Sequence, residues 1–595
     1  MKYKKQIQLI AAIVTLIVFP VITFYLMEAY THNPFEEVRP WAQFFNILLF
    51  ELLAWIFVSV TGKIQSGLRI ELVTAMIYGI ANAYVVRFRT NPIVPWDIFS
   101  WKTAASVASN YDFKPDIRMI VVTLAFLGMI VLLQFVKTGM PKFQLWKRLI
   151  PAGACCIVLV LFVNLLQDED FQTGHRLYPF LFTPAFMTQV NGVAVTFAMD
   201  LAYMTVEKPA GYDAVKEQAL LESYAGQEDD TDSSEKKEEL PNIIVVMNES
   251  FSDLNVLGDF TTNEDYMPYL HSLQNGAENT VTGYLNVSVC GGNTANTEFE
   301  FLTGNSMAFL PQGSIPYQQY ITKELPALPA YLASLGYETV ATHPYYADGW
   351  DRDKVYPLLG FSESIFKDQY WGAGYVRKYV SDNSCVDKII ELYEKKEEGT
   401  PLFVFNVTMQ NHGGYSDTYD NFTPDITVEG VESTPLSQYL SLVRLSDQAL
   451  EKLISYFEEA DEKTIVVFFG DHQPMVEESF YETLAGKPLT EWTLAEAQSR
   501  YIVPFFIWAN YEIDAEENVF TSANFLSELM FEKAGIKLLP YQEFLKEVRE
   551  EIPAMDGGAW RDKDGTWEVL DTSQPILEEY WRLQYRNMFD KKVHY

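Results

Sequence analysis

Residues 464–473 read TIVVFFGDHQ, an apolar run that ends in a glycine, an acid and a histidine. Four further segments share this plan of an apolar run before a polar end: NIIVVMNES (242–250), ETVATHPY (338–345), PLFVFNVTMQNH (401–412) and IVPFFIWAN (502–510). Runs of this kind predict strands of a parallel sheet that is covered on both faces. Segments with helical periodicity separate them, so we expect an α/β layered domain with its site at the carboxyl ends of the strands.

The first third of the chain predicts a membrane domain. Largely uncharged runs, close to the roughly 20 residues that cross a bilayer core, lie at 7–27, 44–60, 70–86, 119–135 and 149–166. Five such runs are typical of a polytopic anchor rather than of a cleavable signal peptide. With the N-terminus inside, basic residues are more frequent in the cytoplasmic segments than in the outer loops, which places everything after residue 167 outside the cytoplasm.

Charge divides the chain in the same place. Residues 1–210 carry 17 Lys and Arg against 13 Asp and Glu, whereas residues 211–595 carry 27 against 66. The acidic second part argues against nucleic acid as a partner, because phosphate binding needs a basic surface. The segment 226–240, GQEDDTDSSEKKEEL, indicates a solvated linker. We therefore expect a five-span transmembrane domain at 1–166, juxtamembrane helices and an acidic linker at 167–240, and an extracellular catalytic domain with a C-terminal packing segment at 241–595.

The residues at the predicted strand ends are able to hold a metal. They are Glu249, His343, His412, Asp471 and His472. A single histidine at a strand end is more often structural, but three beside an Asp-His pair and an acid favour a metal or catalytic site. Glu249, Asp471 and His472 offer two carboxylates and one imidazole, a set suited to Mn²⁺, Mg²⁺ or Zn²⁺.

A hydroxyl group and a cationic segment complete the candidate site. The segment CGGNTANTEFEFLTGNS (290–306) presents Thr294 where a glycine-rich turn becomes a helix. By itself this pattern predicts that Thr294 caps the helix. Beside a dication, the Thr294 hydroxyl becomes a candidate nucleophile. The segment THPYYADGWDRD (342–353) supplies His343, Trp350 and Arg352, and an arginine can grip phosphate through two parallel hydrogen bonds. His412 could protonate a leaving oxygen or bind the phosphate.

Taken in order, these motifs resemble the lipoteichoic acid synthase family, the membrane phosphoglycerol transferases of the alkaline phosphatase/sulfatase superfamily. The resemblance covers nearly the whole chain, and its motifs are NES at Glu249, NTANTEF at Thr294, GWDRD at Trp350 and Arg352, QNH at His412, and GDH at Asp471 and His472. It implies a sulfatase-like outer domain with a largely parallel sheet. It also implies Thr294 as the nucleophile that forms a glycerophospho-threonine.

The resemblance further implies a cofactor and substrates. A Mn²⁺ ion, or alternatively Mg²⁺ or Zn²⁺, is expected at Glu249, Thr294, Asp471 and His472. A glycerol phosphate site is expected at His343, Trp350, Arg352 and His412. Such enzymes take glycerol phosphate from phosphatidylglycerol in the membrane, pass it to a polyglycerol phosphate polymer or a glycolipid, and release diacylglycerol.

Two departures from the family pattern leave the acceptor open. Residues 295–297 are Ala-Asn-Thr where the family commonly has Ser-Asp-Ser, and Gly413-Gly414 stand where the best-known members have His and Pro. A hydrolase or a phosphoethanolamine-type transferase on the same scaffold remains a close alternative. A non-catalytic, membrane-anchored binding protein is the alternative of another class, although a binding module has no need of an activated nucleophile.

Overall fold

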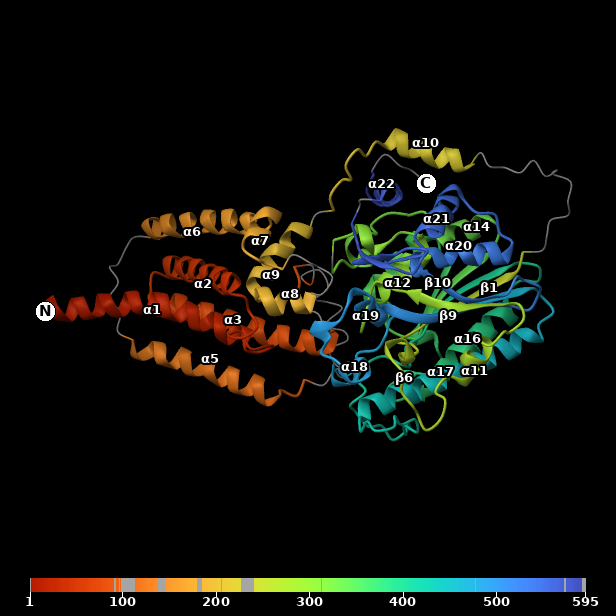
Figure 1. Ribbon diagram of the computed structural model, residues 1–595, viewed down its shortest axis with the longest axis horizontal. Coiled ribbons are helices and arrows are strands. Elements are labelled where there is room, and N and C mark those ends of the chain that lie inside the picture. The colour runs from red at the N-terminus through yellow and green to blue at the C-terminus, as the bar shows by residue number, and fades with distance from the viewer. Residues whose placement is uncertain are drawn as a thin grey trace. The chain divides into compact units, whose positions relative to one another are not determined.

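The computed structural model describes residues 2–89, 92–95, 97, 113–136, 145–178, 184–204, 206–225, 240–311, 313–476, 478–571 and 574–590. The chain divides into two units, of which the first combines Met1–Ile98 with Tyr111–Val206 and the second contains Glu207–Tyr595 (Figure 1). Most of the predicted acidic linker, residues 226–239, lies outside the described residues.

The first unit is built from long apolar helices. They are α1 (Lys2–Glu28), α2 (Pro40–Thr61), α3 (Ile64–Arg89), α5 (Ile117–Phe135) and α6 (Leu145–Leu166). Among the described residues, five stretches are long and apolar enough to cross a membrane: Gln6–Glu28, Pro40–Thr61, Ile64–Arg87, Ile117–Phe135 and Trp146–Leu166. Each overlaps one predicted run, so the prediction of five apolar spans is confirmed.

Three short helices follow the last span: α7 (Glu169–Gly174), α8 (Pro184–Asn191) and α9 (Val193–Asp200). Two buried polar side chains of the long helices bind the start of α9. Glu28 accepts a hydrogen bond from the Val193 N–H at 2.8 Å, and Asn46 accepts one from the Val195 N–H at 3.1 Å. These bonds satisfy N–H groups that have no partner within the helix. The start of α9 is therefore fixed to α1 and α2.

The second unit is organised around an eight-stranded sheet in the order β10-β2-β9-β8-β1-β7-β3-β4. Its strands are β1 (Asn242–Asn248), β2 (Thr280–Asn286), β3 (Glu338–His343), β4 (Glu363–Phe366), β7 (Leu402–Val407), β8 (Thr464–Gly470), β9 (Ile502–Ala509) and β10 (Glu516–Ser522). Every residue of β1, β7 and β8 is buried, as their apolar runs predict. The prediction of a largely parallel central sheet is confirmed.

Helices cover both faces of this sheet (Figure 1). On one face lie α11 (Pro268–Leu273), α16 (Asp382–Lys395) and α17 (Thr434–Glu458), whose buried residues share one apolar core with β1, β7 and β8. The other helices of this unit are α10 (Ala214–Ala225), α12 (Thr294–Thr303), α13 (Pro316–Gln319), α14 (Leu328–Ser334), α15 (Arg352–Leu359), α18 (Glu478–Ala485), α19 (Leu494–Gln498), α20 (Ala523–Ala534), α21 (Pro540–Glu551) and α22 (Pro575–Phe589). The C-terminal helix α22 packs through Leu577 and Tyr580 against residues of α20 and α21, as its apolar positions suggest.

The structure adds a strand direction and small elements that the apolar runs do not predict. Within the large sheet β9 alone runs antiparallel to its neighbours β8 and β2. A small hairpin, β5 (Tyr375–Val376) with β6 (Tyr379–Val380), and a three-stranded sheet of β11 (Ala554–Met555), β12 (Ala559–Arg561) and β13 (Trp567–Val569) complete the unit.

Candidate metal centre and its surroundings

The ends of two neighbouring strands bring Glu249, Asp471 and His472 together. β1 and β8 pair in parallel with Asn248 opposite Gly470, so the residues that follow each strand meet at one edge of the sheet. One potential ligand atom from each of the three side chains lies within 4.8 Å of the others. The His472 Nε2 atom is 3.3 Å from Asp471 Oδ2 and 3.8 Å from Glu249 Oε1.

Hydrogen bonding leaves these atoms suited to a cation. His472 Nδ1 lies 2.8 Å from the carbonyl of Gln473, which can only accept, so Nδ1 carries the proton and Nε2 presents a lone pair. Asp471 Oδ1 accepts from the backbone N–H groups of Ser250 and His472. Its Oδ2 and the His472 Nε2 are buried and have no hydrogen-bond partner among the described residues. Buried polar atoms left this way carry a free-energy cost that a bound dication removes, so the residues fit a divalent metal.

The electrostatics of the cluster agree with this fit. Burial and the charge of Asp471 hold the pKa of Glu249 well above its ordinary value, and burial also raises the pKa of Asp471. Two carboxylates this close repel each other in a site that excludes water. A divalent cation reverses both effects, because it favours the ionised form of each ligand.

Gly470 allows the close approach on which this cluster depends. A Cβ atom at position 470 would lie 1.9 Å from the carbonyl oxygen of Phe251. The glycine is therefore required because the end of β8 contacts the segment after β1, rather than because of a turn conformation. Neighbouring Ser250 takes a positive φ of 51°, a conformation that costs energy for a side-chain-bearing residue.

Thr294 is the first residue of α12 and faces the same cluster. Its hydroxyl donates to Glu249 Oε2 at 3.5 Å and it is buried. The interpretation of Thr294 as the helix cap is wrong, because the N-cap is Asn293, in a left-handed conformation with φ of 66°. A left-handed N-cap turns the chain sharply at the point where the hydroxyl enters the site.

Arg352 is buried and bound to a carboxylate of α12. Its Nε donates to Glu298 Oε1 at 3.0 Å, and Nη2 donates to the same oxygen. The other Glu298 oxygen accepts from Tyr356 at 2.8 Å. Glu298 therefore anchors Arg352. Nη1 also donates to the Gly349 carbonyl at 3.4 Å. The expected two-bond grip on a phosphate therefore cannot use the Nε side of the guanidinium.

His343 and Trp350 frame the segment before Arg352. His343 ends β3 and donates through Nδ1 to the carbonyl of Val407 at 2.9 Å, so its Nε2 is an acceptor. Burial and the charge of Arg352 lower its pKa well below the usual value. Trp350 and Asp351 both take positive φ angles, 58° and 57°. Two successive residues in this conformation indicate a backbone held in place by its surroundings.

His412 follows β7 and is fixed by the β5–β6 hairpin. Its Nδ1 lies 3.1 Å from the Tyr379 hydroxyl. Arg377, which is buried, donates to the backbone carbonyls of Gln410 at 2.9 Å and His412 at 2.6 Å. Burial and the charge of Arg377 lower the pKa of His412 to about 3. The imidazole is neutral at physiological pH, which favours substrate binding over proton donation.

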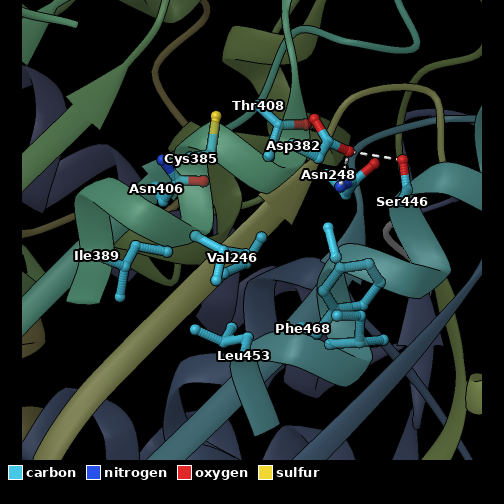
Figure 2. A pocket seen from close by; sticks show the side chains of 13 residues that line it. Val246, Asn248, Asp382, Cys385, Ile389, Asn406, Thr408, Ser446, Leu453 and Phe468 are labelled. Carbon is cyan, nitrogen blue, oxygen red and sulfur yellow. Dashed lines mark hydrogen bonds between the residues drawn. The ribbon is translucent and has the colours of Figure 1, made fainter. Parts of the chain in front are cut away.

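Sequence reasoning missed Asp382, which bonds Asn248 and Ser446 (Figure 2) and so connects the segments carrying Glu249 and His412. Its Oδ2 accepts from Asn248 at 2.8 Å and from Ser446 at 2.6 Å. Asn411, next to His412, donates to Asn248 at 3.1 Å and to Ser446 at 2.9 Å. Asp382 lies in the first turn of α16, where an acid is ordinary, so no local pattern marks it.

Asn248, Asp382 and Ser446 line a buried cavity of about 10 Å³ between α16, α17 and the sheet. Asp382 Oδ1 and Asn406 Oδ1 are buried there, and neither has a hydrogen-bond partner in the part of the chain that the structure describes. The cavity is near the lower limit for one water molecule, roughly 10–15 Å³. None of the candidate metal ligands lines this cavity, so it is not part of the candidate site.

The sequence profile of the sulfatase family matches residues 241–536. A protein of Rhizobium meliloti (strain 1021), whose name assigns it to cyclic beta-1,2-glucan modification, is 32% identical over 78% of this chain and 72% of its own length. The chain belongs to the sulfatase-domain family. Lipoteichoic acid synthase 1 of Bacillus subtilis (strain 168) is 25% identical over 43% of this chain and 40% of its own.

Two solved structures share the fold of this sulfatase-domain protein. The phosphoglycerol transferase GacH of Streptococcus pyogenes, solved with sn-glycerol-1-phosphate, covers 64% of this chain and 95% of its own at 23% identity and a TM-score of 0.51. The lipooligosaccharide phosphoethanolamine transferase EptA of Neisseria meningitidis, an integral membrane protein, covers 87% and 94% at 14% identity and a TM-score of 0.51.

The comparisons confirm the predicted sulfatase domain and the prediction of an enzyme. Members of the sulfatase and alkaline phosphatase superfamily are metal-dependent, and this chain has a candidate metal site at Glu249, Asp471 and His472. The five apolar helices indicate a multi-pass membrane protein. The roles of the individual site residues remain predictions.

Proposed function

We propose that this protein transfers glycerol phosphate from phosphatidylglycerol to a hydroxyl of a saccharide-containing acceptor, by way of a covalent intermediate on Thr294. The observation that carries the proposal is the buried Thr294 hydroxyl pointing at Glu249 beside the unpartnered Asp471 Oδ2 and His472 Nε2. A hydroxyl in this position serves nucleophilic catalysis, whereas a binding module would not require it. The relative named for cyclic glucan modification supports a saccharide acceptor.

The proposed metal ligands are Glu249, Asp471 and His472, together with the Thr294 hydroxyl. A Mn²⁺ ion, with Mg²⁺ or Zn²⁺ as alternatives, would lower the pKa of that hydroxyl and neutralise charge on the phosphoryl oxygens. In the first half-reaction, Thr294 Oγ1 forms a bond to phosphorus and the bond from phosphorus to the diacylglycerol oxygen breaks. The proton lost by Thr294 is balanced by the proton that the diacylglycerol oxygen gains.

The second half-reaction restores Thr294. An acceptor hydroxyl bonds to phosphorus, the Thr294–phosphorus bond breaks, and Thr294 regains a proton as the acceptor loses one. His343, Trp350, Arg352 and His412 are proposed to hold the glycerol phosphate. In this environment the neutral His343 accepts a hydrogen bond from a glycerol hydroxyl through Nε2. Arg352 supplies positive charge near Glu249.

The active site is proposed to work outside the cytoplasm. The basic residues around the apolar helices favour an inner N-terminus, so five spans put the second unit on the outer side. Phosphatidylglycerol in the outer leaflet would then be the donor.

The test uses full-length protein in detergent micelles with labelled phosphatidylglycerol and Mn²⁺. We expect released diacylglycerol and a Thr294 peptide heavier by one glycerol phosphate in mass spectrometry. Thr294→Ala should lose both signals. Thr303→Ala, at the other end of α12, is the matched control, because its hydroxyl bonds the backbone carbonyl of Phe299 and the backbone N–H of Asn305. Normal diacylglycerol release by Thr294→Ala would disprove the mechanism.

The same assay separates the alternatives. Release of free glycerol phosphate, with no product on any added saccharide, would identify a hydrolase. Diacylglycerol formed from phosphatidylethanolamine but not from phosphatidylglycerol would identify a phosphoethanolamine-type transferase.

A further inference from the structure

The strand order places a second set of side chains beside the candidate site. Along the edge where the strands end, Asp471 and His472 follow β8, Glu249 follows β1 and His412 follows β7. The next strands are β3, which leads into Tyr345 and Tyr346, and β4, which leads into Lys367. Neighbouring strands lie about 4.8 Å apart. The residues after β3 and β4 therefore extend the site towards the edge of the sheet.

Three tyrosines connect His412 to the surface, and we refer to Tyr346, Tyr345 and Tyr379 as the tyrosine row. The ring centroids are 5.4 Å apart between His412 and Tyr379, 6.5 Å between Tyr379 and Tyr345, and 4.7 Å between Tyr345 and Tyr346. Tyr345 also lies 6.2 Å from His343. The row thus begins at the two histidines proposed to hold the glycerol phosphate.

The outer end of the row is exposed, whereas its inner members are buried. Tyr346 is 48% exposed, against 6% for Tyr345 and 3% for Tyr379. In the described part of residues 207–590, the large aromatic side chains exposed to this degree are Tyr346, Trp371 and Tyr375. All three come from the segments that follow β3 and β4, so aromatic surface gathers on this side of the site.

A cation accompanies the exposed tyrosine. Lys367 Nζ lies 5.0 Å from the centre of the Tyr346 ring and 5.6 Å from that of Tyr345. The Lys367 N–H donates to the Tyr345 carbonyl at 3.0 Å, which fixes the two segments together. Among the described residues no carboxylate forms an ion pair with Lys367. An ammonium group and an aromatic face on one surface are the pair that a sugar ring needs, because its C–H faces are apolar and its hydroxyls accept hydrogen bonds.

We propose that the tyrosine row and Lys367 form an acceptor subsite for a glycan, with one sugar ring stacked on Tyr346 and its oxygens bonded to Lys367. The inference rests on the proposed function, for which it names the acceptor as a glucan chain rather than a polyglycerol phosphate. Stacking at Tyr346 places the glycan at the outer end of the row whose inner members Tyr379 and Tyr345 lie next to His412 and His343.

The test measures glycan binding directly, independently of phosphoglycerol transfer. Full-length protein in detergent is titrated with a soluble β-1,2-linked glucan oligosaccharide, and binding is followed by calorimetry. We expect binding by the native protein and a dissociation constant about tenfold higher for Tyr346→Ala, since one aromatic stacking contact is worth about that factor. Lys367→Met should also weaken binding.

Leu335→Ala is the matched control. Leu335 is 38% exposed and precedes β3, at the opposite end of that strand from Tyr346, and the variant should bind the glucan like the native protein. Failure of the native protein to bind the glucan would overturn the subsite, as would equal binding by Tyr346→Ala. Loss of binding to phosphatidylglycerol vesicles in Tyr346→Ala, with glucan binding intact, would assign the surface to the membrane instead. Failure of the proposed function would appear separately, as no diacylglycerol release from phosphatidylglycerol.

Discussion

Asp382 does not touch any proposed reacting group, yet it binds Asn248 directly and Asn411 through Ser446. Asp382→Asn replaces one acceptor oxygen by a donor, so Asn248 and Ser446 lose a partner. We expect at least about tenfold weaker Mn²⁺ binding, the usual scale for groups that orient metal ligands. The measurement is the Mn²⁺ concentration that produces half of the thermal stabilisation of the full-length protein.

Asp447→Asn controls for the general cost of altering a buried aspartate. Asp447 is buried on α17 and accepts the N–H groups of Tyr269 and Leu270 at 2.8 and 2.9 Å. Its replacement should lower the melting temperature but leave the Mn²⁺ dependence unchanged. If both variants bind Mn²⁺ equally, Asp382 has no positioning role.

His271 makes stability depend on pH. Its contacts with Asp253 and Asp265 raise its pKa to about 9. The folded protein then holds this proton more tightly than the unfolded chain, whose histidine pKa is about 6.5. The stabilisation is complete below pH 6.5 and is lost as the pH rises through about 9. We expect the melting temperature of the second unit to fall over this interval, and His271→Gln to remove that part of the fall. An unchanged profile in His271→Gln would show that another group titrates.

At the scale of elements, the junction of β8 with the segment after β1 is the most sensitive contact of the site. Gly470→Ala forces a Cβ against the Phe251 carbonyl, which is backbone and cannot rotate away. We expect a loss of about 1–3 kcal/mol in the free energy of unfolding, typical of overpacking, and weaker Mn²⁺ binding because Asp471 is displaced. Urea denaturation of the full-length protein measures the free energy of unfolding.

Gly413→Ala is the matched control in the loop after β7. A Cβ there meets nothing within 4 Å, and the residue does not take a positive φ. Its urea midpoint should stay close to that of the native protein. Equal destabilisation by the two variants would mean that the close approach at Gly470 is relaxed in solution.

The apolar runs predict which segments form strands but not how each strand is directed. IVPFFIWAN has the composition of the parallel strands and is buried like them, yet β9 runs antiparallel. Burial on both faces selects apolar residues whatever the strand direction. The strand Thr280–Asn286 contains Gly283. A Cβ atom at position 283 would lie 1.8 Å from the carbonyl oxygen of Val519, so this glycine is required by a strand that is distant in sequence.

At the scale of the whole molecule, the predicted orientation states on which side of the membrane each segment lies, and this can be tested. In intact cells, a membrane-impermeant maleimide should label Val215→Cys, because Val215 is 78% exposed in α10 beyond the last span. Lys63→Cys, in the exposed turn between α2 and α3, should be labelled only after the cells are permeabilised. The reverse labelling pattern would place the second unit in the cytoplasm.

The sequence by itself determined the five apolar spans, the covered sheet and the polar residues at its strand ends. Those features follow from local composition, since burial in lipid or between helix layers requires runs of apolar residues. It also supplied Glu249, Asp471 and His472 as one candidate set, because residues at the ends of parallel strands meet at one edge. Thr294 was added to that set from the glycine-rich turn that precedes it.

Only the tertiary structure decided how those residues are held. It paired Arg352 with Glu298, placed Asp382 and Arg377 behind the site, and brought the tyrosine row next to His412. Each of these contacts joins segments more than 25 positions apart, and each is made by residue types that are ordinary in their own helix, hairpin or loop. Hydrogen bonds and ring contacts between distant segments leave no periodic trace in the chain, so they exist only once strand order and direction have been set.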